Sequence, residues 1–214
     1  MTQLRLLFFG DSIANGTGDS SYLGWPGRLC AAERARGHDL TLYNLGVRAD
    51  TSAQIRRRWR SEAEARWRSD VAQALVFAFG VNDSAEEGGG AIRVPLDQSL
   101  QNAEAMLTEA KALAPVLWIG PAPIADAMQP LRPSATVSFH FRNRVIADYV
   151  ARYRELAVRM GVPFLDTFEA LGRAPAWARY VAAGDGVHPA AEGYAMLARL
   201  VDDWPAWRRW MGGA

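Results

Sequence analysis

The sequence LRLLFFGDS, residues 4–12, passes directly from an apolar run to a glycine, an aspartate and a serine. An apolar run of this length, with no alternation of polar residues, is typical of a strand covered on both faces of a parallel sheet. In such a sheet, ligands bind beyond the carboxyl ends of the strands, where polar residues follow the apolar run. The stretch therefore predicts a buried parallel strand that carries Asp11 and Ser12 to a functional edge.

Further apolar runs follow along the chain, and helix-like patterns separate them. In residues 97–113, for example, apolar side chains recur at alternating steps of four and three. Strands that alternate with helices form a parallel sheet covered by helices on both faces, because right-handed crossovers place the helices there. We therefore predict an α/β fold, a three-layer α/β/α sandwich, formed by residues 1–214 as a single domain. The predicted strands are 4–9, 40–45, 74–79, 116–120 and 164–165, and the predicted helices are 26–36, 51–67, 97–113, 142–160 and 190–204.

The composition argues against several classes of protein. Half of the 214 residues are hydrophobic, so the chain can bury a large core. Lys and Arg number 24 against 23 Asp and Glu, and this near-neutral balance gives no support to nucleic-acid binding. The single Cys30 cannot form an internal disulfide, and the 3 scattered histidines show no zinc-ligand spacing. We predict no cofactor, no metal and no nucleic-acid partner.

The sequence also bears on the location of the protein in the cell and on its assembly. The amino-terminal apolar run is too short for a signal-peptide core, and no later run approaches the roughly 18 residues of a membrane span. We therefore expect a cytoplasmic protein with no membrane span. Trp204, Trp207 and Trp210 repeat every three residues, a pattern compatible with a homo-oligomer contact. Packing of these side chains back onto the body of the protein is the preferred interpretation.

Polar groups also stand where the other predicted strands end. Residues 46–50 (Gly-Val-Arg-Ala-Asp) follow the second strand, residues 80–83 (Gly-Val-Asn-Asp) follow the third, and residues 185–189 (Asp-Gly-Val-His-Pro) precede the last helix. Each group alone has a simple structural explanation, such as a helix cap at Ser12, a turn at residues 82–83 or a helix start at residues 188–189. Together they bring a serine, an amide, an aspartate and a histidine to one edge of the sheet.

This set of side chains is the one that acyl transfer requires. A serine hydroxyl becomes a good nucleophile when an imidazole takes its proton, and a carboxylate fixes the tautomer of that imidazole. Ser12, His188 and Asp185 supply these three groups. The Ser12 N–H, the side-chain amide of Asn82 and a backbone N–H after the second strand would then stabilise negative charge on the carbonyl oxygen. The chain has neither a Gly-x-Ser-x-Gly elbow nor a Gly-x4-Gly-Lys phosphate loop, which excludes the common α/β-hydrolase and P-loop interpretations.

At these residues the sequence resembles the SGNH, or GDSL, hydrolases. Residues 10–13 (Gly-Asp-Ser-Ile) look like the nucleophile block of the family, residues 80–83 like its Gly-x-Asn-Asp block, and residues 185–189 like its final block. The blocks occur in the family order and span almost the whole chain. The resemblance implies a flavodoxin-like α/β/α fold with a five-stranded parallel sheet, hydrolysis of esters or thioesters, and no cofactor.

One block departs from the family pattern. Members commonly carry Asn-x-x-x-x-Gly-Asp-Thr after the second strand, and the N–H of the glycine helps to form the oxyanion hole. Residues 44–51 of this chain place Ala49 at that glycine. A methyl side chain leaves the N–H in place, provided that the residue need not adopt a left-handed dihedral. We predict that Ala49 donates its N–H, with Gly46 as the fallback donor.

Other segments are assigned roles beside the reaction. The Pro-rich residues 121–139 follow the fourth strand as a long segment without periodicity; they are compatible with a wall of the substrate pocket and equally with a stiff surface connection. Asp11 and Asp83 are expected to brace their loops. Nearby acidic residues balance the charge of the arginines at 56–58 and 60, and this pattern predicts a solvated helix face.

The main hypothesis is a cytoplasmic serine esterase or lipase in which Ser12 is acylated and water, activated by His188, releases the acid. A carbohydrate O-deacetylase or an acyl-thioesterase on the same triad is the nearest alternative. From a different class, a flavodoxin-like binding module would carry a flavin phosphate at the first loop, which would leave Asp185 and His188 without a role. A small-molecule ester or thioester is the expected partner.

Overall fold

A five-stranded parallel sheet forms the centre of the computed structural model, which describes residues 3–88 and 90–212. The strand order is β2-β1-β3-β6-β8, so that β1 lies inside the sheet. Gly10, the last residue of β1, is paired with Gly46 of β2 on one side and with Ala78 of β3 on the other. The ends of three strands therefore meet next to Ser12. The strands are β1 (Leu4–Gly10), β2 (Leu40–Gly46), β3 (Ala72–Ala78), β6 (Val116–Ile119) and β8 (Phe164–Leu165).

The side chains of β1 alternate between two hydrophobic cores, one on each face of the sheet. Leu6 and Phe8 pack in one core, and Leu7 and Phe9 pack in the other. All four side chains are at most 1% exposed. Because both faces are buried, the strand carries a continuous apolar run instead of an alternating one.

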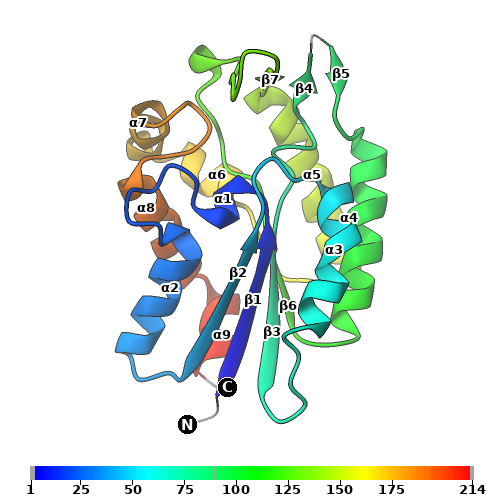
Figure 1. Cartoon of the computed structure of the whole chain (residues 1–214), viewed down its shortest axis with the longest axis vertical. Helices are drawn as coiled ribbons and strands as arrows, with labels where there is room; N and C mark the ends of the chain where they lie inside the picture. Colours follow the sequence, from blue (N-terminus) through cyan, green and yellow to red (C-terminus); the bar gives the residue numbers. More distant parts are fainter. Residues whose placement is uncertain (1–2, 89, 213–214) are drawn as a thin grey trace.

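Helices cover both faces of the sheet (Figure 1). At the start of α3, Thr51 and Gln54 form a capping box, in which the Thr51 N–H donates to Gln54 Oε1 at 2.9 Å. At the end of α5, Gly161 adopts the left-handed backbone that commonly closes a helix. One face carries α2 (Gly24–Ala35), α8 (Ala191–Asp202) and α9 (Pro205–Gly212), and the other carries α3 (Ser52–Glu64), α4 (Leu96–Lys111) and α5 (Asn143–Met160).

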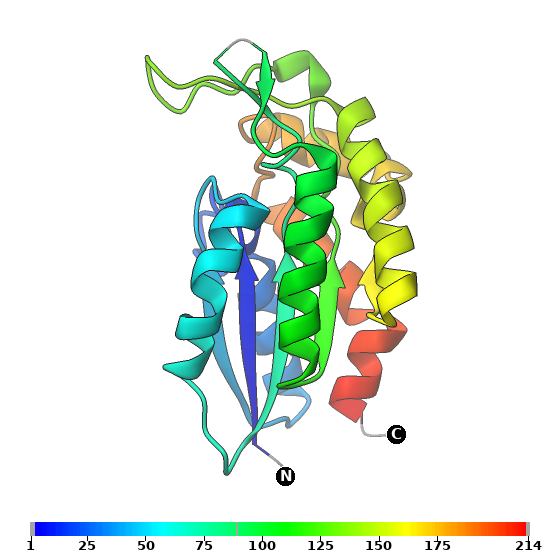
Figure 2. The ribbon, with the colours of Figure 1, turned by 90° about the vertical axis from the view of Figure 1, so that its right-hand side faces the viewer.

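Short elements gather beyond the carboxyl ends of the strands (Figure 1). Three of them pair as a small antiparallel sheet in the order β5-β4-β7. The segment that leads from η1 to β7 projects beyond the main sheet (Figure 2). These elements enclose the edge at which Ser12 stands. They are α1 (Ser12–Asn15), β4 (Glu86–Glu87), β5 (Ala91–Ile92), η1 (Asp126–Met128), β7 (Phe139–His140), α6 (Thr167–Gly172) and α7 (Pro175–Ala183).

The predicted α/β class and the predicted strands are confirmed, with strand ends displaced by at most two residues. All five predicted helices are present as α2, α3, α4, α5 and α8. The pattern did not predict the short helices α7 and α9, each of which begins at a proline. Trp207 of α9 is fully buried, and Trp204 and Trp210 pack against the same core. Packing of the tryptophans onto the body of the protein is therefore confirmed.

Candidate active site

Ser12 lies at the turn between the central strand β1 and the single-turn helix α1. Asp11 is the N-cap of this helix, because its Oδ1 accepts the Ile13 N–H at 2.9 Å. The helix ends after one turn at Gly16, which has a left-handed φ of 86°. This sharp turn holds the Ser12 side chain at the edge of the sheet, where it is 5% exposed.

His188 and Asp185 come from the loop between α7 and α8. Asp185 Oδ1 accepts the backbone N–H groups of Val187 and His188 at 3.0 and 2.8 Å, which folds the loop back on itself. Gly186 has a left-handed φ of 88°, and a Cβ at this position would lie 2.7 Å from Met128 Cβ. Its carbonyl accepts the Ala125 N–H at 2.9 Å. The segment after β6 therefore packs directly on the histidine loop.

The structure brings Ser12, His188 and Asp185 into one hydrogen-bonded row. Ser12 Oγ lies 2.7 Å from His188 Nε2, and His188 Nδ1 lies 2.6 Å from Asp185 Oδ2. A carboxylate accepts but cannot donate, so the proton sits on Nδ1 and leaves Nε2 free to accept from the serine hydroxyl. Burial alone would raise the pKa of Asp185, but the hydrogen bond and the charge of His188 lower it to about 2. The carboxylate is thus held ionised, and His188 beside it is 6% exposed.

Asn82 reaches the same edge from the turn that follows β3. Its Nδ2 donates to the Asp50 carbonyl at 3.1 Å and makes a longer hydrogen bond of 3.3 Å to Asp11 Oδ2. Asn82 is 4% exposed, and it lines the same pocket as Ser12 and His188. The side-chain amide therefore links the loops after β1, β2 and β3.

Asp11 and Asp83 brace loops, as predicted. Burial raises the pKa of Asp11 to about 6, although the Ile13 N–H and the charge of His188 act in the opposite direction. Asp83 accepts the Ser52 N–H at 2.7 Å and a hydrogen bond from the Ser99 hydroxyl. Asp83 thereby fixes the start of α3 against α4.

Ala49 has a left-handed backbone, with a φ of 64°. The proviso that this residue need not be left-handed is therefore wrong: the position has the conformation that suits the family glycine, and here an alanine adopts it under strain. Among the described residues, no hydrogen-bond acceptor is paired with the Ala49 N–H. The Gly46 N–H, by contrast, donates to Asn44 Oδ1 at 3.1 Å. A Cβ at Gly46 would lie 2.3 Å from the Asn15 nitrogen, so this glycine serves the close packing of β2 on α1.

A pocket of about 510 Å³ opens beside Ser12 and His188. The segment from 131 to 139 supplies one side of it. This part of the Pro-rich stretch 121–139 therefore forms a pocket wall, one of the two alternatives that the sequence left open. Leu131, Val137 and Phe139 of this segment, with Phe141 beside them, give the wall an apolar part, and Arg132 and Ser134 give it a polar part. The Leu131 and Phe139 backbones pair with each other through two hydrogen bonds of 2.9 Å, which close the segment into a hairpin-like loop.

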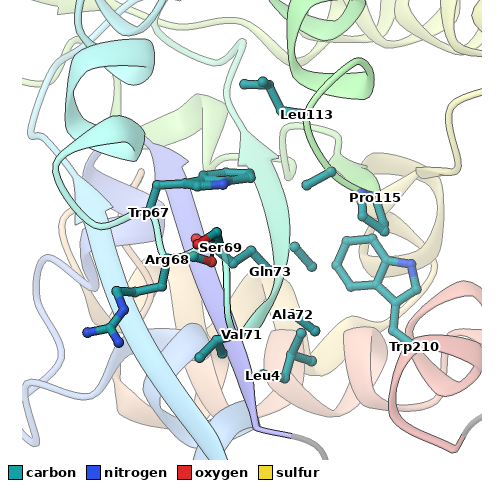
Figure 3. Close-up of a pocket in the computed structure, with 12 residues that line it drawn as sticks. Leu4, Trp67, Arg68, Ser69, Val71, Ala72, Gln73, Leu113, Pro115 and Trp210 are labelled. Carbon is teal, nitrogen blue, oxygen red and sulfur yellow. Dashed lines mark hydrogen bonds between the residues drawn. The ribbon is translucent and has the colours of Figure 1, made fainter.

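A second hollow, of about 560 Å³, lies at the opposite, amino end of the sheet. Trp67 and Trp210 stand on two sides of it, with Gln73 of β3 between them (Figure 3). Its lining residues include neither a histidine nor a carboxylate. Because no side chain there can act as a general base, the pocket at Ser12 is the one suited to acyl transfer.

Two arginines support the site in a way that sequence reasoning missed. Arg58, predicted on a solvated face, points inward instead: its Nη2 donates to the Gly10 carbonyl at 3.0 Å, and its Nε lies 2.7 Å from Asp50 Oδ2. Arg93 Nη2 donates to the Ala49 carbonyl at 2.9 Å. The prediction of a solvated face is therefore wrong at Arg58, because the hydrophobic pattern of α3 does not reveal that the loop carbonyls need a donor.

Two general properties follow from the described residues. Across residues 3–88 and 90–212, no group of three or more His, Cys, Asp or Glu side chains is arranged to hold a metal ion. Within the same ranges, none of the helices combines the length and the hydropathy of a membrane span.

The fold and the row of serine, histidine and aspartate at its carboxyl edge define a class, the three-layer α/β/α acylhydrolases. Residues 8–196 match the model of the GDSL-like lipase/acylhydrolase family, and the chain belongs to this family. The resemblance to SGNH hydrolases is thereby confirmed. No match was found among curated proteins.

Solved structures with the same fold cover nearly the whole chain. The lipase/acylhydrolase from Enterococcus faecalis has a TM-score of 0.75 and 22% sequence identity, over 99% of this chain and 96% of its own. A catalytic mutant of an acetylxylan esterase from Geobacillus stearothermophilus has a TM-score of 0.72 and 20% identity, over 97% and 94%. The protein TesA has a TM-score of 0.68 and 24% identity, over 92% and 95%. At these identities the likeness shows a shared fold.

Proposed function

We propose that this protein is a serine esterase that cleaves carboxylic esters through an acyl-enzyme intermediate, with residues 1–214 acting as one domain. The observation that carries the proposal is the 2.7 Å contact between Ser12 Oγ and His188 Nε2 at the floor of a pocket. Serine and imidazole at this distance can exchange a proton without a change of structure. Two structures of the Geobacillus esterase, a serine-to-alanine and a histidine-to-alanine variant, are described as catalytic mutants, which supports these roles.

The reaction takes place in two steps. His188 Nε2 takes the hydroxyl proton of Ser12 as Oγ attacks the ester carbonyl, and the same proton passes to the departing alkoxide, which leaves as an alcohol. Water then attacks the acyl-serine, again losing its proton to His188, and the acid leaves while Ser12 regains its hydrogen. Asp185, which accepts from Nδ1 at 2.6 Å, stabilises the imidazolium in both steps.

Three donors stabilise the negative charge that forms on the carbonyl oxygen. They are the Ser12 N–H, the Ala49 N–H and the side-chain amide of Asn82, and all three residues line the pocket. Among the described residues, no acceptor is paired with the N–H of Ser12 or of Ala49. Substrate can therefore bind these two groups without breaking an existing hydrogen bond. The 3.3 Å contact between Asn82 and Asp11 is long enough to yield to an oxyanion. Donors fixed in this way contribute about 3 to 4 kcal/mol each in related chemistry.

The pocket wall favours esters with a hydrocarbon part over acetylated sugars. Leu131, Val137 and Phe139 present apolar surface next to Ser12, and these three side chains carry no hydrogen-bonding group for a sugar hydroxyl. An acyl-thioesterase uses the same triad and the same wall, and it remains the alternative on this active site. A screen of p-nitrophenyl esters from acetate to palmitate, beside acyl-thioesters and acetylated sugars, distinguishes the three.

The variant Ser12→Ala tests the proposal directly. Removal of the nucleophile lowers kcat by about 10⁴ to 10⁶ in enzymes of this type. We expect that loss with an unchanged circular dichroism spectrum, and an organophosphate adduct on Ser12 of the wild-type protein. Ser61→Ala, which removes an exposed hydroxyl of α3, is the matched control. Retention of more than about a tenth of the activity in Ser12→Ala would remove Ser12 from the mechanism.

A wild-type protein that hydrolyses none of these substrates would instead favour the non-enzymatic alternative, the flavodoxin-like binding module. In that case the purified protein should bind a flavin phosphate. Flavin absorbance and a binding isotherm measure this outcome.

A further inference from the structure

The pocket beside Ser12 has two cationic residues in its lining as well as an apolar wall. Arg48 comes from the loop after β2, immediately before Ala49, and Arg132 comes from the loop between β6 and β7. Both side chains are exposed to solvent. Two segments separated by more than eighty positions thus each place a guanidinium at the same pocket.

Neither arginine is neutralised by the protein. Among the described residues, Arg48 and Arg132 take part in no ion pair, whereas the nearby Arg93 and Arg142 are paired with Glu87 and Glu86. The one carboxylate in the pocket lining is Asp185.

Asp185 is hydrogen-bonded to His188 at 2.6 Å, and its single negative charge offsets at most one of the two guanidinium charges. With two arginines and one carboxylate in its lining, the pocket carries a net positive charge. Cations beside an apolar, low-dielectric wall attract anions more strongly than the same cations on an open surface.

We propose that the preferred substrate is an anionic ester. Its hydrocarbon part lies on Leu131, Val137 and Phe139, and a carboxylate or phosphate group elsewhere in the same molecule binds Arg48 and Arg132. This inference rests on the proposed function, since it names the substrate class of the same site. Guanidinium groups suit both anions, because each presents parallel N–H donors to a pair of oxygens.

Two matched pairs of esters test the proposal and locate the anion. In the first pair, 4-carboxyphenyl butyrate and the neutral 4-carbamoylphenyl butyrate differ in the charge of the leaving group. In the second, the p-nitrophenyl monoester of octanedioic acid and p-nitrophenyl octanoate differ in the charge at the far end of the acyl chain. For each pair, the ratio of kcat/KM, anionic over neutral, cancels any change that affects both substrates equally.

We expect Arg48→Gln and Arg132→Gln each to lower the ratio about threefold in at least one pair, and the double variant to lower it about tenfold, as measured at low ionic strength. The Lys variants, Arg48→Lys and Arg132→Lys, keep the charge and should keep the ratio within about twofold. Added salt, about 0.5 M, should reduce the wild-type ratio in the same direction. Arg159→Gln is the matched control, because Arg159 is an exposed arginine in the last turn of α5, at the opposite end of the sheet.

The outcomes separate the two proposals. If neutral esters are hydrolysed but both ratios are the same in the wild-type protein and the double Gln variant, the charge recognition is wrong and the esterase proposal stands. An equal fall of the kcat/KM ratio in Arg159→Gln would also overturn the inference, because the effect would then come from the net charge of the protein and not from the pocket. If none of the esters is hydrolysed, the proposed function itself fails.

Discussion

Ala49 combines a left-handed backbone with a backbone N–H that is free to bind substrate. An alanine in this conformation costs about 1 kcal/mol or more. Glycine removes that strain but loses about 0.4 to 1 kcal/mol through the greater freedom of the unfolded chain. We therefore expect Ala49→Gly to change the free energy of unfolding by less than about 1 kcal/mol and to keep kcat/KM within about tenfold. Urea unfolding measures the stability, and steady-state kinetics measure kcat/KM. The variant Ala49→Val should be less stable than both the wild-type protein and Ala49→Gly.

Deletion of the N–H alone separates the two candidate donors. An amide-to-ester replacement at Ala49 removes only this group and should lower kcat at least about tenfold. The same replacement at Gly46 is the control, because its N–H is already bonded to Asn44. Sensitivity at Gly46 with indifference at Ala49 would assign the second oxyanion donor to Gly46 and leave the triad unchanged.

The buried carboxyl of Asp11 links stability to pH. Burial raises the pKa of Asp11 from 3.8 to about 6, so between these values the folded protein holds a proton that the unfolded chain releases. The contribution of Asp11 to stability therefore falls as pH rises through this window, by about 2 to 3 kcal/mol in total. Asp11→Asn keeps an N-cap but does not titrate. Urea unfolding from pH 4 to 7.5 should show the variant gaining stability relative to the wild-type protein, and a constant difference would contradict the raised pKa.

At the scale of the elements, Arg93 joins the candidate oxyanion loop to the pocket wall. It donates to the Ala49 carbonyl at 2.9 Å, and its guanidinium lies 4.6 Å from the centre of the Phe139 ring. Arg93→Met keeps the aliphatic stem but loses the donor and the cation–π contact. We expect stability to fall by about 1 to 2 kcal/mol and kcat to fall about fivefold, because Ala49 is no longer held.

The control for this prediction is Arg60→Met on the exposed face of α3. Within residues 3–88 and 90–212, Arg60 pairs with Glu64 alone, one turn along the helix, and such surface pairs contribute about 0.5 kcal/mol or less. Loss of stability in Arg93→Met without loss of kcat would restrict Arg93 to a role in the fold.

The strands and long helices could be predicted from sequence because each has a periodicity of its own. The run 4–9 carries the signature of a strand covered on both faces, and the structure buries its side chains in two cores, one on each face of the sheet. The position of Asp185 and His188 just before the last predicted helix likewise placed both residues at the edge of the sheet that carries Ser12. Arg58 and Arg93 could not be found this way, since what they bind are backbone carbonyls that only the folded loops bring near. The left-handed φ of Ala49 could not be predicted either, because the identity of one alanine does not indicate its backbone dihedral.

At the scale of the whole molecule, the two hollows lie at opposite ends of the sheet. Trp210 lines the one at the amino end (Figure 3). Its ring centre is 6.3 Å from that of Trp207. Trp210→Ala should lower the free energy of unfolding by about 1 to 3 kcal/mol through lost packing. The sheet separates this position from Ser12, so kcat/KM should stay within about twofold. Thermal unfolding and ester kinetics on the same preparation measure the two effects, and a large loss of kcat/KM would show coupling between the ends.

The hydrogen bond between Ser12 and His188 joins positions 176 residues apart, and this separation has a consequence for biosynthesis. At ribosomal rates of about 5 to 20 residues per second, Ser12 is made roughly 9 to 35 s before His188. Throughout that interval the nascent chain carries Ser12 without His188, the base that we propose for it. Under the proposed mechanism, the hydroxyl of Ser12 becomes reactive only after nearly all of the sheet and its covering helices have been synthesised, and a chain that ends before His188 would not hydrolyse esters.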